Sequence, residues 1–270
     1  MLSSPTLVCV HAHPDDEALF TAGTSAHYAQ RGVRAVLVTC TYGQLGIDHS
    51  GLPGSAPGHD SDQTRATRAG ELQVAARMVG YDRVVTLGYD DSGLLGWTQN
   101  ANPRAFMNAD VDAVADVLGA LLDEVGATVV VTYDENGFYG HPDHIAANAV
   151  TRRAVERSRT VERLFYPVAP QAVLDAFVPA ARERGVFLPE WVLRGVGVGP
   201  DSVDVTLDVS HFASLKQASI AAHASQVDNA GLESMDEDLF ELLFGVEYYQ
   251  LAWRRRAIDV DGADLFGGLT

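Results

Sequence analysis

Two short segments of the chain concentrate histidine and aspartate side chains at a spacing that suits metal chemistry. The first, residues 11–17, reads His-Ala-His-Pro-Asp-Asp-Glu and follows an apolar run typical of a β-strand. So many acids and histidines in one place would repel one another or titrate unless a cation joins them, and a divalent metal suits them best. Acids in a first helical turn also complement the helix dipole, which explains Glu17 but not His13 at the strand tip.

The second segment repeats this chemistry. Residues 139–144 read Tyr-Gly-His-Pro-Asp-His and again lie where a strand gives way to a helix. Neighbouring strands of a parallel sheet would bring the two segments together, so that His13, Asp16 and one histidine of the second pair form a metal site. Two histidines and one carboxylate leave coordination positions open for water and substrate, as in catalytic sites. Spacing alone leaves open whether His141 or His144 is the ligand; the other would act beside the metal as proton donor or electrophile.

The elements expected around these segments alternate between strands and helices. Continuous apolar runs predict strands covered on both faces, as in a parallel sheet, and amphipathic stretches between them predict helices. This order indicates an α/β fold with a Rossmann-like, mostly parallel sheet flanked by helices, formed by a core of about residues 1–166. Residues 167–270, where the pattern weakens, are expected to form a C-terminal extension packed on the same core, within a single domain of residues 1–270.

The expected elements can be placed by residue number. The core strands are Leu7–His11, Ala35–Cys40, Arg83–Leu87, Thr128–Tyr133 and Arg163–Tyr166. The core helices are Glu17–Arg31, Gln63–Val79 and a segment over 111–125 whose apolar residues recur at helical spacing. The extension is expected to add helices near Gln171–Arg184 and Ser210–Ser225 and a strand at Val203–Leu207. Long connections that follow strands would leave the carboxyl edge of the sheet, where open α/β sheets bind ligands. They are Thr41–Asp62, Gly88–Asn108 and Asp134–His141.

Composition narrows the classes of partner. The 270 residues carry 36 acidic against 19 basic side chains, a net charge of −17 that repels phosphate backbones and disfavours nucleic acid. No apolar run approaches the roughly 20 residues that span a membrane, and the N-terminus has no basic region typical of a secretory leader. Cys9 and Cys40 lie in apolar runs, which predicts buried thiols in a reducing compartment, the cytoplasm. The sequence leaves the oligomeric state open, and the absence of G-x-G-x-x-G disfavours dinucleotide binding.

Together the two segments resemble the signature of the PIG-L family, also called LmbE-like N-deacetylases. The resemblance implies a zinc-dependent hydrolase that removes the N-acetyl group from an N-acetylglucosamine-containing small molecule. It implies one zinc per chain, with Fe²⁺ or another divalent metal as the alternative, held by His13, Asp16 and His144. It also implies a general base, Asp15, one position from the ligand Asp16.

The resemblance assigns further roles on the second segment. Tyr139 would help polarise the acetyl carbonyl. His141 would be the electrophile or acid beside the metal, and Asp143 would orient it. The resemblance thus selects between the two histidines that spacing left open.

Within the family, the nearest resemblance is to the deacetylase and the conjugate amidase of mycothiol metabolism. Arg68 and Asp91 match positions that hold sugar hydroxyls in that deacetylase, and residues 223–227 also resemble those enzymes. One departure is Gln44 and Leu45, which stand where those enzymes carry acids. An apolar residue in place of a charged acceptor predicts that an inositol aglycone binds less well than a simple or hydrophobic one.

Two other functions compete with this interpretation. The same zinc site would serve an amidase acting on a thiol conjugate or on an antibiotic-type intermediate. The second alternative is a metal-containing sugar-binding protein without turnover. A protein that only binds needs no base or proton donor beside an open metal position, so the sequence disfavours this alternative on the evidence of Asp15, Tyr139 and His141. Supporting or surface roles are expected for His11 and His223.

Overall fold

The computed structural model describes residues 5–186, 188, 195–227 and 230–269. Its centre is a sheet with the strand order β3-β2-β1-β4-β5-β8-β7, and β6 pairs with β5. The strands are β1 (Thr6–His11), β2 (Arg34–Thr41), β3 (Arg83–Tyr89), β4 (Val129–Val131), β5 (Arg163–Pro170), β6 (Gly197–Val198), β7 (Val205–Asp208) and β8 (Val246–Arg254). β1 to β5 pair in parallel, and β8 runs antiparallel to both β5 and β7. The predicted α/β class with a mostly parallel sheet is confirmed.

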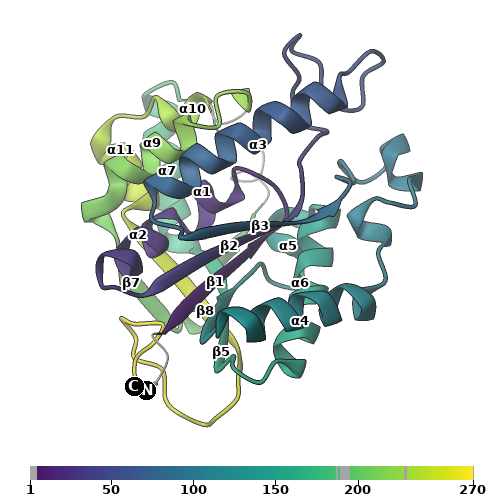
Figure 1. The fold of residues 1–270 in the computed structure, drawn as a ribbon. Helices are drawn as coiled ribbons and strands as arrows, with labels where there is room; N and C mark the ends of the chain where they lie inside the picture. The colour runs from purple at the N-terminus through teal and green to yellow at the C-terminus, as the bar shows by residue number, and fades with distance from the viewer. Residues whose placement is uncertain (1–4, 187, 189–194, 228–229, 270) are drawn as a thin grey trace.

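Helices cover both faces of this sheet (Figure 1). They are α1 (Asp16–Phe20), α2 (Ala22–Gln30), α3 (Ser61–Met78), α4 (Val111–Val125), α5 (Gly137–Gly140), α6 (Pro142–Arg157), α7 (Gln171–Glu183), α9 (Ala213–Ala221), α10 (Ala230–Glu233) and α11 (Glu237–Phe244). Short 3₁₀ turns are η1 (Thr98–Ala101), η2 (Phe106–Asn108), η3 (Pro200–Ser202) and η4 (Ser210–Phe212). In Figure 1, α4 and α6 lie on one side of the sheet, whereas α2, α3 and α9 lie on the other.

Strand β1 shows why the core strands read as continuous apolar runs. Val8 and Val10 pack into the cluster that contains α4 and α6, and Leu7 and Cys9 pack into the cluster on the opposite face. Successive side chains of a strand point to opposite faces, so a strand between two helical layers needs apolar residues at every position. The two cysteines are buried free thiols, as predicted.

Two local predictions need correction. The single helix expected over Glu17–Arg31 is wrong, because the chain forms α1 and α2 with a break at Thr21 (φ −137°, ψ 7°). The Thr21 hydroxyl contacts His11 Nε2 and the Tyr81 hydroxyl, both at 2.9 Å, so the break serves buried polar contacts. The extension also contains the long strand β8, which sequence reasoning missed; with Glu247 buried and three apolar residues in a row at 251–253, it has no regular alternation of apolar and polar residues.

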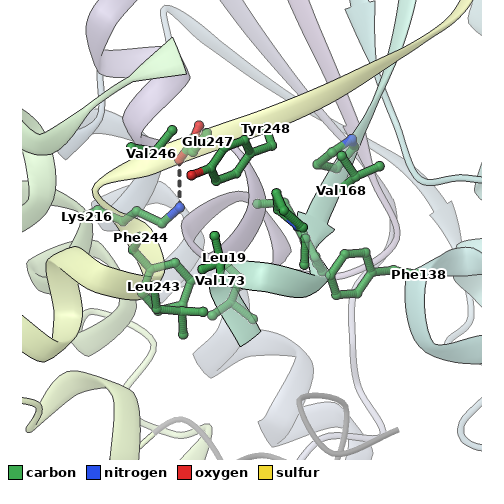
Figure 2. A pocket seen from close by; sticks show the side chains of 14 residues that line it. Leu19, Phe138, Val168, Val173, Lys216, Leu243, Phe244, Val246, Glu247 and Tyr248 are labelled. Carbon is green, nitrogen blue, oxygen red and sulfur yellow. Dashed lines mark hydrogen bonds and ion pairs between the residues drawn. The ribbon is translucent and has the colours of Figure 1, made fainter. Parts of the chain in front are cut away.

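The C-terminal extension completes the sheet and borders a pocket (Figure 2). Apolar side chains from α1, α5, β5 and α11 form most of the pocket wall, and among them Phe20 places its ring centroid 6.3 Å from that of His144. At one side, Lys216 Nζ lies 2.6 Å from Glu247 Oε1 in an ion pair that links α9 to β8. Glu247 also accepts the Gly23 and Thr24 N–H groups at the start of α2, so this buried pair ties the extension to the core.

No helix among the described residues combines the length and apolarity that crossing a membrane requires.

Candidate active site

The two histidine–aspartate segments meet at the carboxyl edge of the sheet. Strands β1 and β4 are parallel neighbours, and each is followed by one of the segments. The ring centroid of His13 lies 4.6 Å from that of His141 and 5.4 Å from that of His144. The predicted juxtaposition of the segments is therefore present.

The side chains of Asp16 and His144 face each other. Asp16 Oδ2 accepts hydrogen bonds from the Tyr133 hydroxyl at 2.6 Å and the His13 main-chain N–H at 2.8 Å. Asp16 Oδ1 lies 3.4 Å from His144 Nε2, a fully buried atom that has no hydrogen-bond partner. His144 Nδ1 contacts the Gly137 carbonyl at 3.2 Å and must donate to it, so in a neutral ring Nε2 keeps its lone pair.

This arrangement fits a metal ion. Two donor atoms on one tetrahedral zinc, each at about 2.1 Å, lie about 3.4 Å apart. His144 Nε2 and Asp16 Oδ1 have this separation, and His13 Nδ1 lies at the same distance from the other carboxylate oxygen, Oδ2. Although burial opposes ionisation, His144 and His13 hold the pKa of Asp16 well below its usual range, so Asp16 is a carboxylate.

Proximity alone does not choose between the two histidines of the second segment. Ligand atoms of His13, His141 and His144 all lie within 4.8 Å of one another. The neutral tautomers distinguish them: His141 Nδ1 uses its lone pair to accept the Asp143 main-chain N–H at 3.1 Å, whereas His144 Nδ1 donates to the Gly137 carbonyl and leaves the Nε2 lone pair available.

The second ring nitrogen of His13 faces carboxylates. His13 Nε2 lies 3.2 Å from Asp143 Oδ2 and 3.7 Å from Asp91 Oδ1. Burial disfavours the charged ring, yet Asp91, Asp143 and Asp16 raise the pKa of His13 well above its ordinary value. Metal-ligating histidines commonly donate their other N–H to a carboxylate, which fixes the ring orientation. The cluster of His13, Asp91 and Asp143 fits this supporting arrangement.

Asp143 contacts His141 in a different way from the one expected. Its main-chain N–H donates to His141 Nδ1, while its carboxylate accepts the Ser92 N–H at 2.9 Å and the Ser92 hydroxyl and faces His13. Because His141 Nδ1 accepts, the neutral ring carries its proton on Nε2. Burial, followed by the charges of His13 and His144, lowers the pKa of His141 well below its ordinary value, so the ring is neutral.

Asp15 precedes the metal-ligand candidate Asp16 in the chain, and its own carboxylate accepts a hydrogen bond from Arg68. Burial and the neighbouring Asp16 carboxylate raise the pKa of Asp15, although Arg68 opposes the shift. A raised pKa improves a carboxylate as a proton acceptor. Tyr139, in α5, places its ring centroid 5.0 Å from that of His144 and 6.1 Å from that of His141.

Arg68 and Asp91, the predicted sugar contacts, are buried and bonded to the protein. Arg68 Nη1 donates to the Gly43 carbonyl at 2.7 Å, and Nη2 donates to the Pro14 carbonyl and to Asp15 Oδ1, the latter at 3.0 Å. Asp91 accepts the Gly93 N–H at 2.8 Å and the Leu45 N–H at 3.3 Å. Both residues belong to the walls of the site, and a contact with sugar stays a prediction.

Comparison with known proteins decides the family. The family model PIG-L, described as GlcNAc-PI de-N-acetylase, matches residues 8–155 of the chain. The chain belongs to the PIG-L family. This match contains every residue predicted for the site.

Relatives of this PIG-L protein extend the likeness over the whole chain. A protein of Salinispora arenicola named 1D-myo-inositol 2-acetamido-2-deoxy-alpha-D-glucopyranoside deacetylase is 40% identical, covering 91% of this chain and 84% of its own. A protein of the same name from Acidothermus cellulolyticus is 38% identical, covering 98% and 95%.

Solved structures share the fold. N,N'-diacetylchitobiose deacetylase from Pyrococcus horikoshii aligns with a TM-score of 0.60 at 18% identity, covering 92% of this chain and 84% of that one. A deacetylase of teicoplanin biosynthesis, solved with teicoplanin, gives a TM-score of 0.62 at 20% identity and covers 91% and 96%.

Sequence reasoning missed two residues of this PIG-L site. The Tyr133 ring stacks on His144 with centroids 3.9 Å apart and planes 13° apart, and its hydroxyl bonds Asp16. Ser92 holds the Asp143 carboxylate. A hydroxyl-bearing aromatic just after a buried valine strand was the available signal for Tyr133, and for Ser92 the signal was its place next to Asp91 in a stretch that resembles the mycothiol enzymes.

Proposed function

We propose that this chain is a metal-dependent N-deacetylase that hydrolyses the acetamido group of an N-acetylglucosamine-containing small molecule. The observation that carries the proposal is the buried, unpartnered Nε2 of His144, which faces Asp16 Oδ1 at 3.4 Å. A metal ligand set beside the separate carboxylate of Asp15 is what hydrolysis of an amide needs. Membership of the PIG-L family and relatives that are named deacetylases support the same reaction.

We propose zinc as the metal, one ion per chain, with His13, Asp16 and His144 as its ligands and Fe²⁺ as the alternative. When bound, the ion supplies Lewis-acid activation of a water molecule and of the acetyl carbonyl. The buried free thiols Cys9 and Cys40 support a reducing compartment, the cytoplasm. The strands β7 and β8, which extend the core sheet, support a single catalytic domain of residues 1–270.

The chain's own residues move the protons. Asp15 accepts a proton from the water that attacks the acetyl carbon. The Tyr139 hydroxyl and His141 Nε2–H donate hydrogen bonds to the oxygen that becomes negatively charged. Asp15 then passes this proton to the amide nitrogen as the C–N bond breaks, and acetate and the free amino sugar leave. Asp143 supports His141 through its main chain and His13 through its carboxylate.

For the substrate, we propose that Asp91 and Arg68 contribute to binding of the sugar. Leu45 is held beside them, because its N–H donates to Asp91 Oδ2. An apolar side chain at that position supports a preference for a simple or hydrophobic aglycone over inositol. Because Arg68 also bonds Asp15, Arg68→Ala is expected to lower kcat as well as raise KM.

The test is a panel of substrates offered to metal-reconstituted protein. It compares the inositol glycoside named for the relatives, a hydrophobic N-acetylglucosaminide and a thiol conjugate, with free amine measured as product. We expect amine from both glycosides and a higher kcat/KM for the hydrophobic one. Preference for the inositol compound would contradict the interpretation of Leu45, and exclusive cleavage of the thiol conjugate would make the chain an amidase. Absence of product from every compound would leave a non-catalytic binding protein.

A further inference from the structure

Glu17 makes contacts that interaction with a helix dipole does not require. Its side chain is fully buried, and Oε2 accepts the Asp15 main-chain N–H at 3.0 Å. Its other oxygen, Oε1, lies 2.6 Å from Nε2 of His223, which is 206 residues away and whose side chain is also fully buried. A carboxylate that only complements a helix dipole would face solvent, so this buried pair needs another explanation.

The backbone of Asp15 is held in an unfavourable conformation. Its φ is +99° and its ψ −27°, and Phe138 is the other non-glycine residue with positive φ in the described part of the chain. Such a conformation is unfavourable for a residue that has a side chain, and it persists only where the surroundings enforce it. The Asp15 carbonyl accepts the Ala18 and Leu19 N–H groups at the start of α1, and Glu17 accepts the Asp15 N–H. Glu17 therefore holds the N–H of Asp15, and the first turn of α1 holds its carbonyl.

The side chain of Asp15 is held from α3. Arg68 donates to Asp15 Oδ1 and to the Pro14 carbonyl, so it fixes both the carboxylate and the preceding peptide. One turn further along α3, Glu71 accepts the Ser225 N–H at 2.8 Å and the Ser225 hydroxyl at 2.7 Å.

One turn of the C-terminal extension thus contacts Glu17 directly and, through Glu71, the helix that carries Arg68. His223 bonds Glu17, Ser225 bonds Glu71 on the helix of Arg68, and the Gln226 N–H closes the turn on the His223 carbonyl at 2.8 Å. Among the described residues, the hydrogen-bond donor to Glu17 Oε1 is His223 Nε2. Without it, the carboxylate would lose the bond that aims Oε2 at the Asp15 N–H.

We propose that Glu17 and His223 are positioning residues for the general base: the turn 223–226 of the extension holds Glu17, and Glu17 holds Asp15 in its left-handed conformation beside the metal ligands. The inference rests on the proposed function, in which Asp15 takes the proton from water. It assigns the C-terminal extension a part in catalysis that does not involve contact with substrate.

The main test variant is His223→Phe, which fills the space of the ring and removes the donor. Loss of a residue that orients catalytic groups from outside typically costs about 10–100-fold in activity. We expect kcat to fall by about this factor per metal-loaded, folded enzyme, while KM and metal content stay within about twofold of wild type.

Lys216→Met is the matched control. Lys216 also makes a buried ion pair that ties α9 to the body of the protein, and its carboxylate partner is Glu247 of β8 rather than Glu17 (Figure 2). Both variants should lower the melting temperature, and only His223→Phe should lower kcat. An equal loss of kcat in the two variants, or wild-type kcat in His223→Phe, would overturn the proposal.

A double-mutant cycle separates positioning of Asp15 from general disruption. If His223 acts through Asp15, His223→Phe should have little further effect on kcat in an Asp15→Asn background. The same fold-loss in both backgrounds would contradict the inference. If His223→Phe does not fold, Glu17→Gln replaces it, because one amide oxygen cannot accept from both Asp15 and His223, and the same pattern is expected.

A crystal structure of the variant gives a readout that does not depend on turnover. We expect Asp15 to leave its positive φ or to lose its contact with Arg68, and an unchanged Asp15 would count against the proposal. An inactive wild type would instead refute the proposed function, and the structural readout would still decide the positioning role.

Discussion

Tyr133→Phe removes the hydroxyl group that bonds the candidate metal ligand Asp16. The Tyr133 hydroxyl donates to Asp16 Oδ2 at 2.6 Å, accepts the Ala12 N–H at 2.9 Å and lies 3.3 Å from His11 Nδ1. Phenylalanine keeps the ring that stacks on His144. The substitution therefore tests the hydroxyl alone.

The magnitude follows from the groups left unpaired. The Ala12 N–H and one Asp16 oxygen lose a buried partner, which costs about 1–3 kcal/mol of unfolding free energy. Partners that orient a metal ligand typically contribute 10–100-fold to metal affinity, or about 1.4–2.8 kcal/mol. We expect the metal dissociation constant of Tyr133→Phe to rise by about that factor.

The assay is competition for zinc against a chromophoric chelator, with denaturant unfolding of the metal-free proteins alongside. Tyr249→Phe is the matched control, because its fully buried hydroxyl contacts Thr24 Oγ1 at 2.6 Å and Glu247 Oε2 at 3.0 Å, away from the metal-ligand candidates. It should lose similar stability and keep wild-type metal affinity. Unchanged affinity in folded Tyr133→Phe would refute the role given to Asp16 as a ligand held by Tyr133.

Three further predictions concern the site and its surroundings. Asp15→Asn should retain the metal and lose at least about 10²-fold in kcat, measured with metal analysis on the same sample; near-normal turnover would leave Asp15 with a structural part only. His144→Ala should lose the metal and His141→Ala should keep it, and the reverse result would exchange their roles. Burial lowers the pKa of His11 from 6.5 to about 4, so the unfolded chain binds the extra proton between those values and stability falls as pH drops through this window. His11→Gln should reduce the loss of unfolding free energy between pH 7 and pH 5 by about 2 kcal/mol, and an unchanged loss would contradict the shift.

The sequence was sufficient where chemistry and local spacing coincide. The histidines and aspartates around Pro14 and Pro142 stand next to the strand ends, so their convergence follows from the order of β1 and β4. Continuous apolar strands likewise predict a sheet covered on both faces. In these cases the information lies within a few residues of the site.

Contacts between distant segments could not be predicted in this way. The family resemblance implied that Asp143 orients His141, but its carboxylate bonds Ser92, which arrives from another loop. Glu17 was interpreted as a dipole residue because its partner, His223, is 206 residues away. The local pattern did not predict β8 either, because this strand is mostly half-buried and is defined by antiparallel pairing with β5, a strand distant in the sequence. Each depends on tertiary packing that one segment does not encode.

Acetate release measured on one preparation in three states tests the central claim most directly. The protein is assayed against an N-acetylglucosaminide as purified, after removal of metal with a chelator, and after addition of one equivalent of zinc, with His13→Ala treated in parallel. We predict acetate and free amine in equal amounts, loss of both after chelation, recovery with zinc, and no recovery in His13→Ala. Full turnover by the metal-free protein would contradict the account.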